Sequence, residues 1–220
     1  MKISKAKQEE LVDEMCDFLI KESGIKPDFN YLKLNKRNFL NNLLLLHATE
    51  NLGDYFYSLQ DKLLSSEREK PVNVMALKYK KDIAYTKADV TNINADMVVY
   101  FSESVIDVSM EETMDNKILL KAGLQVGADL YQQHKENGFL PDYNSPYITD
   151  AYNLPANFLA KVLIKHEENA DYGNGFKQIF NFALENEVCS VFIDLPKEIN
   201  KEAIIILKPK QIKLIFNEGN

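Results

Sequence analysis

The run Met97-Val98-Val99-Tyr100-Phe101 decides the fold class of this chain. A continuous apolar run of this length is typical of a strand covered on both faces, because a strand with one wet face alternates apolar and polar side chains. Such strands lie in the interior of parallel or mixed sheets. We therefore expect Met97–Phe101 to be a buried central strand.

Short apolar runs and helical stretches alternate around this strand. A helix is predicted from about Met114 to Glu136, with a stop at Asn137 and Gly138, and another from about Gly175 to Glu185. Further strands are expected at Val72–Leu77, Ile83–Thr86, Tyr147–Tyr152, Phe158–Lys165, Val188–Leu195, Ala203–Leu207 and Gln211–Phe216. This order predicts the α/β class, as a three-layer α/β/α sandwich with a mixed sheet.

The first 70 residues have a helical texture instead. Apolar residues recur at helical spacing in Lys5–Glu22, Arg37–Thr49 and Asp54–Leu64. The polar stretch Ser65–Lys70 precedes Pro71, which favours a boundary there. We divide the chain into a helical N-terminal extension, 1–70, and an α/β domain, 71–220.

The net charge and the cysteine content limit the cellular compartments and the kinds of partner that we expect for this chain. The net charge of -7 and the pI near 5.1 predict a surface that repels phosphate backbones, so nucleic acid is not expected as a partner. Cys16 and Cys189 lie far apart within apolar stretches, as reduced thiols do. The longest apolar run, Leu43–Leu46, is too short to cross a membrane. A cytoplasmic protein without membrane contact is therefore expected.

Three segments resemble the macro domain, the fold that binds ADP-ribose. They are Lys87–Val99, Tyr147–Ala156 with its Tyr-Asn-Leu-Pro-Ala turn, and Phe182–Val191, and the resemblance covers about residues 72–195. The N-terminal helices are similar to the extension of the bacterial zinc-containing macro subgroup, whose members are protein ADP-ribose hydrolases. The resemblance implies a macro-domain-like fold with ADP-ribose or a related nucleotide as ligand. It also implies that Asp89, with Val90 beside it, contacts the adenine, although an Asp before Val-Thr equally tightens a loop locally.

The chain departs from the family at both loops that hold phosphate. The family's Gly-rich first loop corresponds to Ser102–Met110, which has no glycine and adds carboxylates, so side chains are expected to fill the ligand's space. The second loop corresponds to Asp194–Asn200, again without glycine, and the long helix that follows it in the family is expected to be deleted. No Cys or His lies between Ser102 and Asn116, so neither zinc nor another cofactor is predicted.

These departures lead to a main hypothesis and two alternatives. The main hypothesis is a degenerate, non-catalytic binding or interaction module, with no catalytic residue and no metal ligand assigned. The first alternative is an ADP-ribosyl hydrolase, with Asp107 or Glu111 positioning water, or an ADP-ribose binder with a remodelled site. In the second, the N-terminal helices dock a protein partner through an apolar stripe that could equally pack on the α/β domain: Tyr55, Phe56, Leu59 and Leu63.

Other features carry weaker signals. The pair Gly173 and Gly175 could present amides to an anion but is more typical of a turn that begins a helix. The three histidines have no nucleophile arranged beside them in sequence and are expected to be surface or interface residues. The basic run Lys78–Lys81 is expected to be a wet strand or turn.

Overall fold

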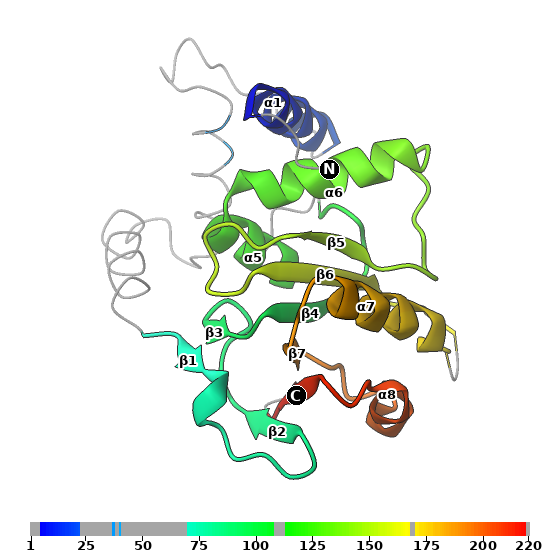
Figure 1. Ribbon diagram of the computed structural model, residues 1–220. Coiled ribbons are helices and arrows are strands. Elements are labelled where there is room, and N and C mark those ends of the chain that lie inside the picture. Colours follow the sequence, from blue (N-terminus) through cyan, green and yellow to red (C-terminus); the bar gives the residue numbers. More distant parts are fainter. Residues whose placement is uncertain are drawn as a thin grey trace, which may run out of the picture.

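A six-stranded mixed sheet organises the molecule (Figure 1). The computed structural model describes residues 5–22, 37, 40, 70–107, 113–167 and 170–218. All neighbouring strands run parallel except β5, which is antiparallel to β6. The strand order is β2 (Ile83–Thr86), β8 (Lys213–Asn217), β7 (Ser190–Ile193), β4 (Met97–Ser102), β6 (Phe158–Leu163) and β5 (Tyr147–Asp150).

Helices cover both faces of this sheet, which confirms the predicted layered α/β fold (Figure 1). Helices α5 (Met114–Ala122) and α6 (Leu124–Glu136) pack on one face, and α7 (Gly173–Glu185) and α8 (Lys201–Leu207) on the other. Helix α1, Lys5–Glu22 as predicted, packs through Leu11, Met15 and Leu19 against α6.

Strand β4 is the central strand that the apolar run predicts. Its six residues are all buried, and it pairs with β6 on one side and β7 on the other. Val98 and Tyr100 face the α5/α6 layer, whereas Val99 and Phe101 face α7. Burial on both faces explains why polar residues are almost absent from this strand.

The predicted helix Met114–Glu136 is in fact two helices. Gly123, with φ of 101°, separates α5 from α6, in a conformation that favours glycine. The Gly123 amide donates to Leu119 O at 3.0 Å, and Asn153 N donates to the freed carbonyl of Ala122 at 3.2 Å. The Tyr-Asn-Leu-Pro-Ala turn therefore contacts the chain at the break between α5 and α6. Helical periodicity in the sequence does not reveal this tertiary contact.

The prediction of a strand at Ala203–Leu207 is wrong, because this segment forms α8. Asn200 begins the helix by accepting a hydrogen bond from Glu202 N at 3.0 Å. Strands β7 and β8 are parallel neighbours, and parallel neighbours need a connection that crosses one face of the sheet. Helix α8 is part of this connection.

At the start of the domain, the predicted strand Val72–Leu77 is also shorter than expected. Only β1 (Val72–Asn73) is a strand, paired with β3 (Ile93–Asn94), and the 3-10 turn Val74–Ala76 follows it. The predicted helices Arg37–Thr49 and Asp54–Leu64, and the apolar stripe on the second of them, lie outside the described residues apart from Arg37 and Leu40. Among the helices that the structure describes, none has the length and apolarity needed to span a bilayer.

Candidate functional site

Asp89 lies in a tight loop before β3, where its carboxylate already has partners. Thr91 donates to Asp89 Oδ1 through its amide at 2.9 Å and through its hydroxyl at 2.6 Å. Lys117 of α5 forms an ion pair with Asp89 Oδ2. Burial raises the pKa of Asp89, but the hydrogen bonds from Lys117 and Thr91 outweigh it and hold the pKa below its usual value. Asp89 is therefore ionised at neutral pH.

The loop also determines what Val90 can offer a ligand. Its side chain is buried in the core on the α5/α6 face, so only its backbone could reach a ligand. The local tightening by Thr91 is what the sequence predicts for an Asp in this position. Lys117 is a partner that sequence reasoning missed, because α5 approaches the loop only in the folded chain.

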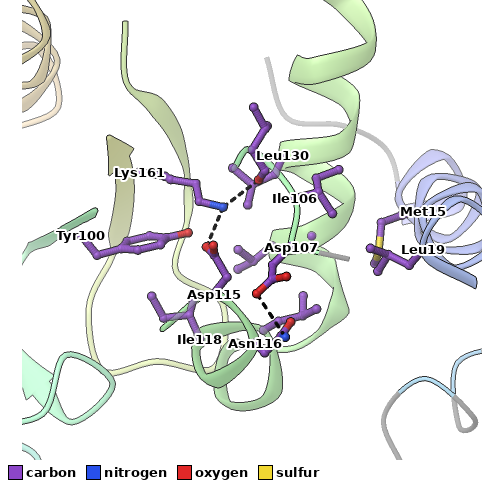
Figure 2. A pocket seen from close by; sticks show the side chains of 14 residues that line it. Met15, Leu19, Tyr100, Ile106, Asp107, Asp115, Asn116, Ile118, Leu130 and Lys161 are labelled. Carbon is purple, nitrogen blue, oxygen red and sulfur yellow. Dashed lines mark hydrogen bonds and ion pairs between the residues drawn. The ribbon is translucent and has the colours of Figure 1, made fainter. Parts of the chain in front are cut away.

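A charged cluster is buried where β4, β6 and α5 meet (Figure 2). Lys161 of β6 is 1% exposed, and its Nζ lies 2.6 Å from Asp115 Oδ1 of α5. The same ammonium donates to Val105 O at 2.7 Å. Tyr100 is the β4 residue in register with Lys161, and the Lys161 Nζ lies 5.8 Å from its ring centre. Ser102 donates a hydrogen bond to the other carboxylate oxygen of Asp115.

Burial dominates the ionisation of this cluster. It lowers the pKa of Lys161 against the opposing attraction of Asp115, and it raises the pKa of Asp115 against the opposing attraction of Lys161. It also raises the pKa of Tyr100 well above its usual value, and the Asp115 charge adds to this effect. Removing two charges from water costs about as much as their attraction returns, so each depends on the other to remain buried.

The space beside the cluster is small. A cavity of about 20 Å³ is lined by Lys161, Asp115 and Asp107 from the α/β domain and by Met15 and Leu19 of α1 (Figure 2). A cavity of this size holds about one water molecule. It has no room for a ribose or a phosphate.

In the segment that follows β4, the described residues are held by hydrogen bonds. Asp107 Oδ2 accepts from Thr113 Oγ1 at 2.5 Å and from Asn116 Nδ2 at 3.4 Å, so the carboxylate lies at the start of α5. Ser104 N donates to Ser102 Oγ at 3.3 Å. Glu111, the other candidate for positioning water, lies outside the described residues, as do Val108 to Met110.

The segment Asp194–Asn200, which follows β7, is also held by hydrogen bonds. Asp194 N donates to Val99 O at 2.9 Å, and its side chain accepts from Asn217 Nδ2 at 2.8 Å. At the far end of the loop, Asn200 begins α8. Hydrogen bonds therefore fix both ends of the segment that connects β7 to α8.

Gly173 and two of the three histidines are further candidates that the structure describes. Asp171 Oδ1 accepts from Gly173 N at 2.7 Å at the start of α7, which occupies one of the amides that an anion would need. His134 packs edge-on against Phe139, and His166 is exposed. In the described part of the chain no three His, Cys, Asp or Glu side chains gather as metal ligands.

Solved macrodomains share this arrangement of strands and helices. The Trypanosoma brucei macrodomain in complex with ADP-ribose superposes with a TM-score of 0.56 at 15% identity, over 68% of this chain and 72% of that chain. The same macrodomain in complex with ADP gives 0.55 at 17% identity, over 68% and 71%. A further crystal form gives 0.56 at 13% identity, over 99% of this chain and 89% of that chain.

The chain therefore has the macro-domain fold, and at these identities the likeness shows the fold alone. No protein-family profile and no curated protein matches the sequence. Lys161, Asp115 and Lys117 are the site residues that sequence reasoning missed. A lysine in the middle of the apolar run Phe158–Leu163 was the available signal, because a buried lysine needs a partner.

Proposed function

We propose that this protein is a non-catalytic binding or interaction module that retains the macro-domain fold and has lost the loops for the ADP-ribose phosphates. The observation that carries the proposal is the buried Lys161–Asp115 pair. Ligands of open α/β sheets bind outside the carboxyl ends of the strands. In this chain Ser102 ends β4 and contacts Asp115, so the cluster lies toward that end of the sheet.

The charges of the cluster also disfavour a diphosphate. The Lys161 ammonium is already ion-paired with Asp115 and donates to Val105 O, so a phosphate would have to displace an existing partner. Asp115 and Asp107 add two carboxylates to the lining of the same cavity. An anion would meet repulsion there without the exposed backbone amides that usually hold phosphate.

One observation favours the alternative of an ADP-ribose binder with a remodelled site. The Asp89 side chain is 40% exposed and its pKa lies below the usual value, so the carboxylate is ionised and partly open to solvent. We keep Asp89 and Val90 as the proposed adenine contacts for that alternative. Lys117 would have to release one carboxylate oxygen for a base amino group to bind there.

Calorimetric titration with ADP-ribose separates these two proposals. We expect no saturable heat from this protein, whereas the Trypanosoma brucei macrodomain, solved in complex with ADP-ribose, serves as the positive control. The matched variant Asp89→Asn should give the same flat titration. Micromolar binding that Asp89→Asn weakens would establish the alternative and overturn the proposed loss of the site.

A release assay on a mono-ADP-ribosylated protein tests the absence of catalysis. We expect release no faster than in buffer, with or without added zinc. Faster release that is abolished by Asp107→Asn would assign a hydrolase and identify Asp107 as its water-positioning residue.

A further inference from the structure

The structure gathers lysines from two distant segments onto one surface. The turn at residues 78–82 precedes β2, and residues 208–213 lead into β8, which pairs with β2 in the sheet (Figure 1). Leu214 N donates to Asp82 O at 2.9 Å, which joins the two segments directly. We call this the lysine surface, and its basic residues are Lys78, Lys80, Lys81, Lys208, Lys210 and Lys213.

Side-chain contacts confirm that the two segments face one another. Lys213 Nζ lies 5.1 Å from the centre of the Tyr79 ring. Lys208 Nζ lies 3.9 Å from Asp82 Oδ2 and donates to Ile212 O at 2.8 Å. Lys208 therefore holds the surface together, whereas Lys78, Lys80, Lys81 and Lys210 are exposed.

The turn that carries Lys78, Lys80 and Lys81 contains two residues with positive φ. Lys81 and Asp82 have φ of 53° and 63°, and Lys80 and Ile83 exchange backbone hydrogen bonds of 2.8 and 3.2 Å across them. Two consecutive positive φ values normally select Asn, Asp or Gly. Asp82 suits this conformation, whereas Lys81 is the residue that is strained in it.

The charge of this surface contrasts with that of the rest of the chain. Its six lysines and Asp82 give +5, and since the whole chain carries -7, the remaining residues carry -12. At physiological ionic strength charges are screened beyond about 8 Å. A partner confined to the lysine surface meets attraction, whereas a long polyanion that extends past it meets the acidic remainder.

We propose that the lysine surface docks a short, carboxylate-rich segment of a partner protein. Lysine is a compact point charge with three rotatable donors, so it suits carboxylates without requiring one fixed orientation. No arginine occurs on the surface, although planar, two-pronged recognition of phosphate favours arginine. The inference goes beyond the proposed function and does not depend on the fate of the ADP-ribose cleft.

Fluorescence anisotropy with a labelled deca-glutamate peptide tests the docking site. We expect saturable binding at low ionic strength that weakens as salt is added, because exposed charges are screened. The variant Lys78→Glu, Lys80→Glu, Lys210→Glu should bind about tenfold or more weakly, because three attractions become repulsions. The matched control Lys121→Glu, Lys177→Glu, Lys197→Glu changes the net charge equally at exposed lysines elsewhere and should bind within about twofold of the native chain.

Several results would overturn the assignment of the lysine surface as a docking site. No binding of the peptide at low ionic strength, or equal losses in the two variants, would show that there is no docking site at this surface. Tighter binding of a short DNA duplex, or of vesicles rich in phosphatidylserine, with the same dependence on the three lysines would replace the protein partner with nucleic acid or membrane. If the glutamate variant unfolds, the glutamine variant at the same three positions gives the comparison.

Discussion

The two faces of the sheet bury their side chains by different means. On the α7/α8 face, Phe176 and Ile179 are both 0% exposed and pack against Val99 and Phe101, so the contact is hydrocarbon and aromatic. On the α5/α6 face, Lys161 is 1% exposed and depends on Asp115. Apolar burial stabilises each side chain independently, whereas a buried ion pair offsets its desolvation only while both partners are present. The ion pair on the α5/α6 face is therefore sensitive to the loss of either partner.

The largest expected effect comes from breaking the ion pair on one side. Lys161→Met leaves Asp115 buried without its partner, which costs about 3–5 kcal/mol of the free energy of unfolding. Phe176→Ala on the other face should cost a similar amount, about 3–5 kcal/mol, by leaving a cavity. The two variants differ in pH dependence, which chemical denaturation at several pH values measures.

The sign of that dependence follows from Asp115. Its pKa in the folded protein is already raised by burial and rises further without Lys161, so the loss is smallest below its ordinary value of 3.8 and grows as pH rises. Phe176→Ala has no such dependence. The double variant Lys161→Met, Asp115→Leu should regain most of the loss, because no charge remains buried. A double variant as unstable as the single one would show that packing, not charge, holds the cluster.

A smaller effect is expected at the break between α5 and α6. Gly123→Ala forces a side chain into φ of 101°, with the new Cβ 2.6 Å from Gln125 Oε1 and 3.2 Å from Asn153 Nδ2, at a cost of about 1–3 kcal/mol. Gly138→Ala is the control, because its φ of 65° lies in the ordinary left-handed region and nothing lies within 4 Å of the new Cβ. Thermal unfolding should show the larger loss for Gly123→Ala. Equal losses would mean that the contacts with Gln125 and Asn153 add nothing to the backbone strain.

The smallest effect concerns the attachment of α1 to the α5/α6 face. The hydrogen bond from Lys135 lowers the pKa of Glu14 below its ordinary value of 4.5, with the two side-chain atoms 2.8 Å apart. The contribution is therefore present above pH 4.5 and is lost as pH falls through the lowered pKa. Glu14→Gln should remove this pH dependence in unfolding measurements, and Glu9→Gln on the same helix should not. If the free energy of unfolding depends on pH in the same way for the native chain and Glu14→Gln, the proposed contribution of the Glu14–Lys135 pair is wrong.

Sequence patterns predicted the elements that local chemistry determines. Helix α1 and strand β2 have the predicted bounds, and β4 is the predicted central strand. The predictions failed where contacts with other segments of the chain determine the local structure. Ala203–Leu207 is too short for periodicity to distinguish strand from helix, and the parallel pairing of β7 and β8 selects the helix. The Gly123 break likewise depends on Asn153, which lies on a different segment.

By itself, the sequence determined the layered α/β class and the absence of glycine from Ser102–Met110 and Asp194–Asn200, because apolar period and residue type are local properties. Only the tertiary structure decided that Lys161 meets Asp115, that Lys117 meets Asp89, and that Lys78–Lys81 joins Lys208–Lys213. Each of these contacts joins different elements of the fold. Charges act over a few ångströms of space and not along the chain, so their partners are known only once the strands and helices are assembled.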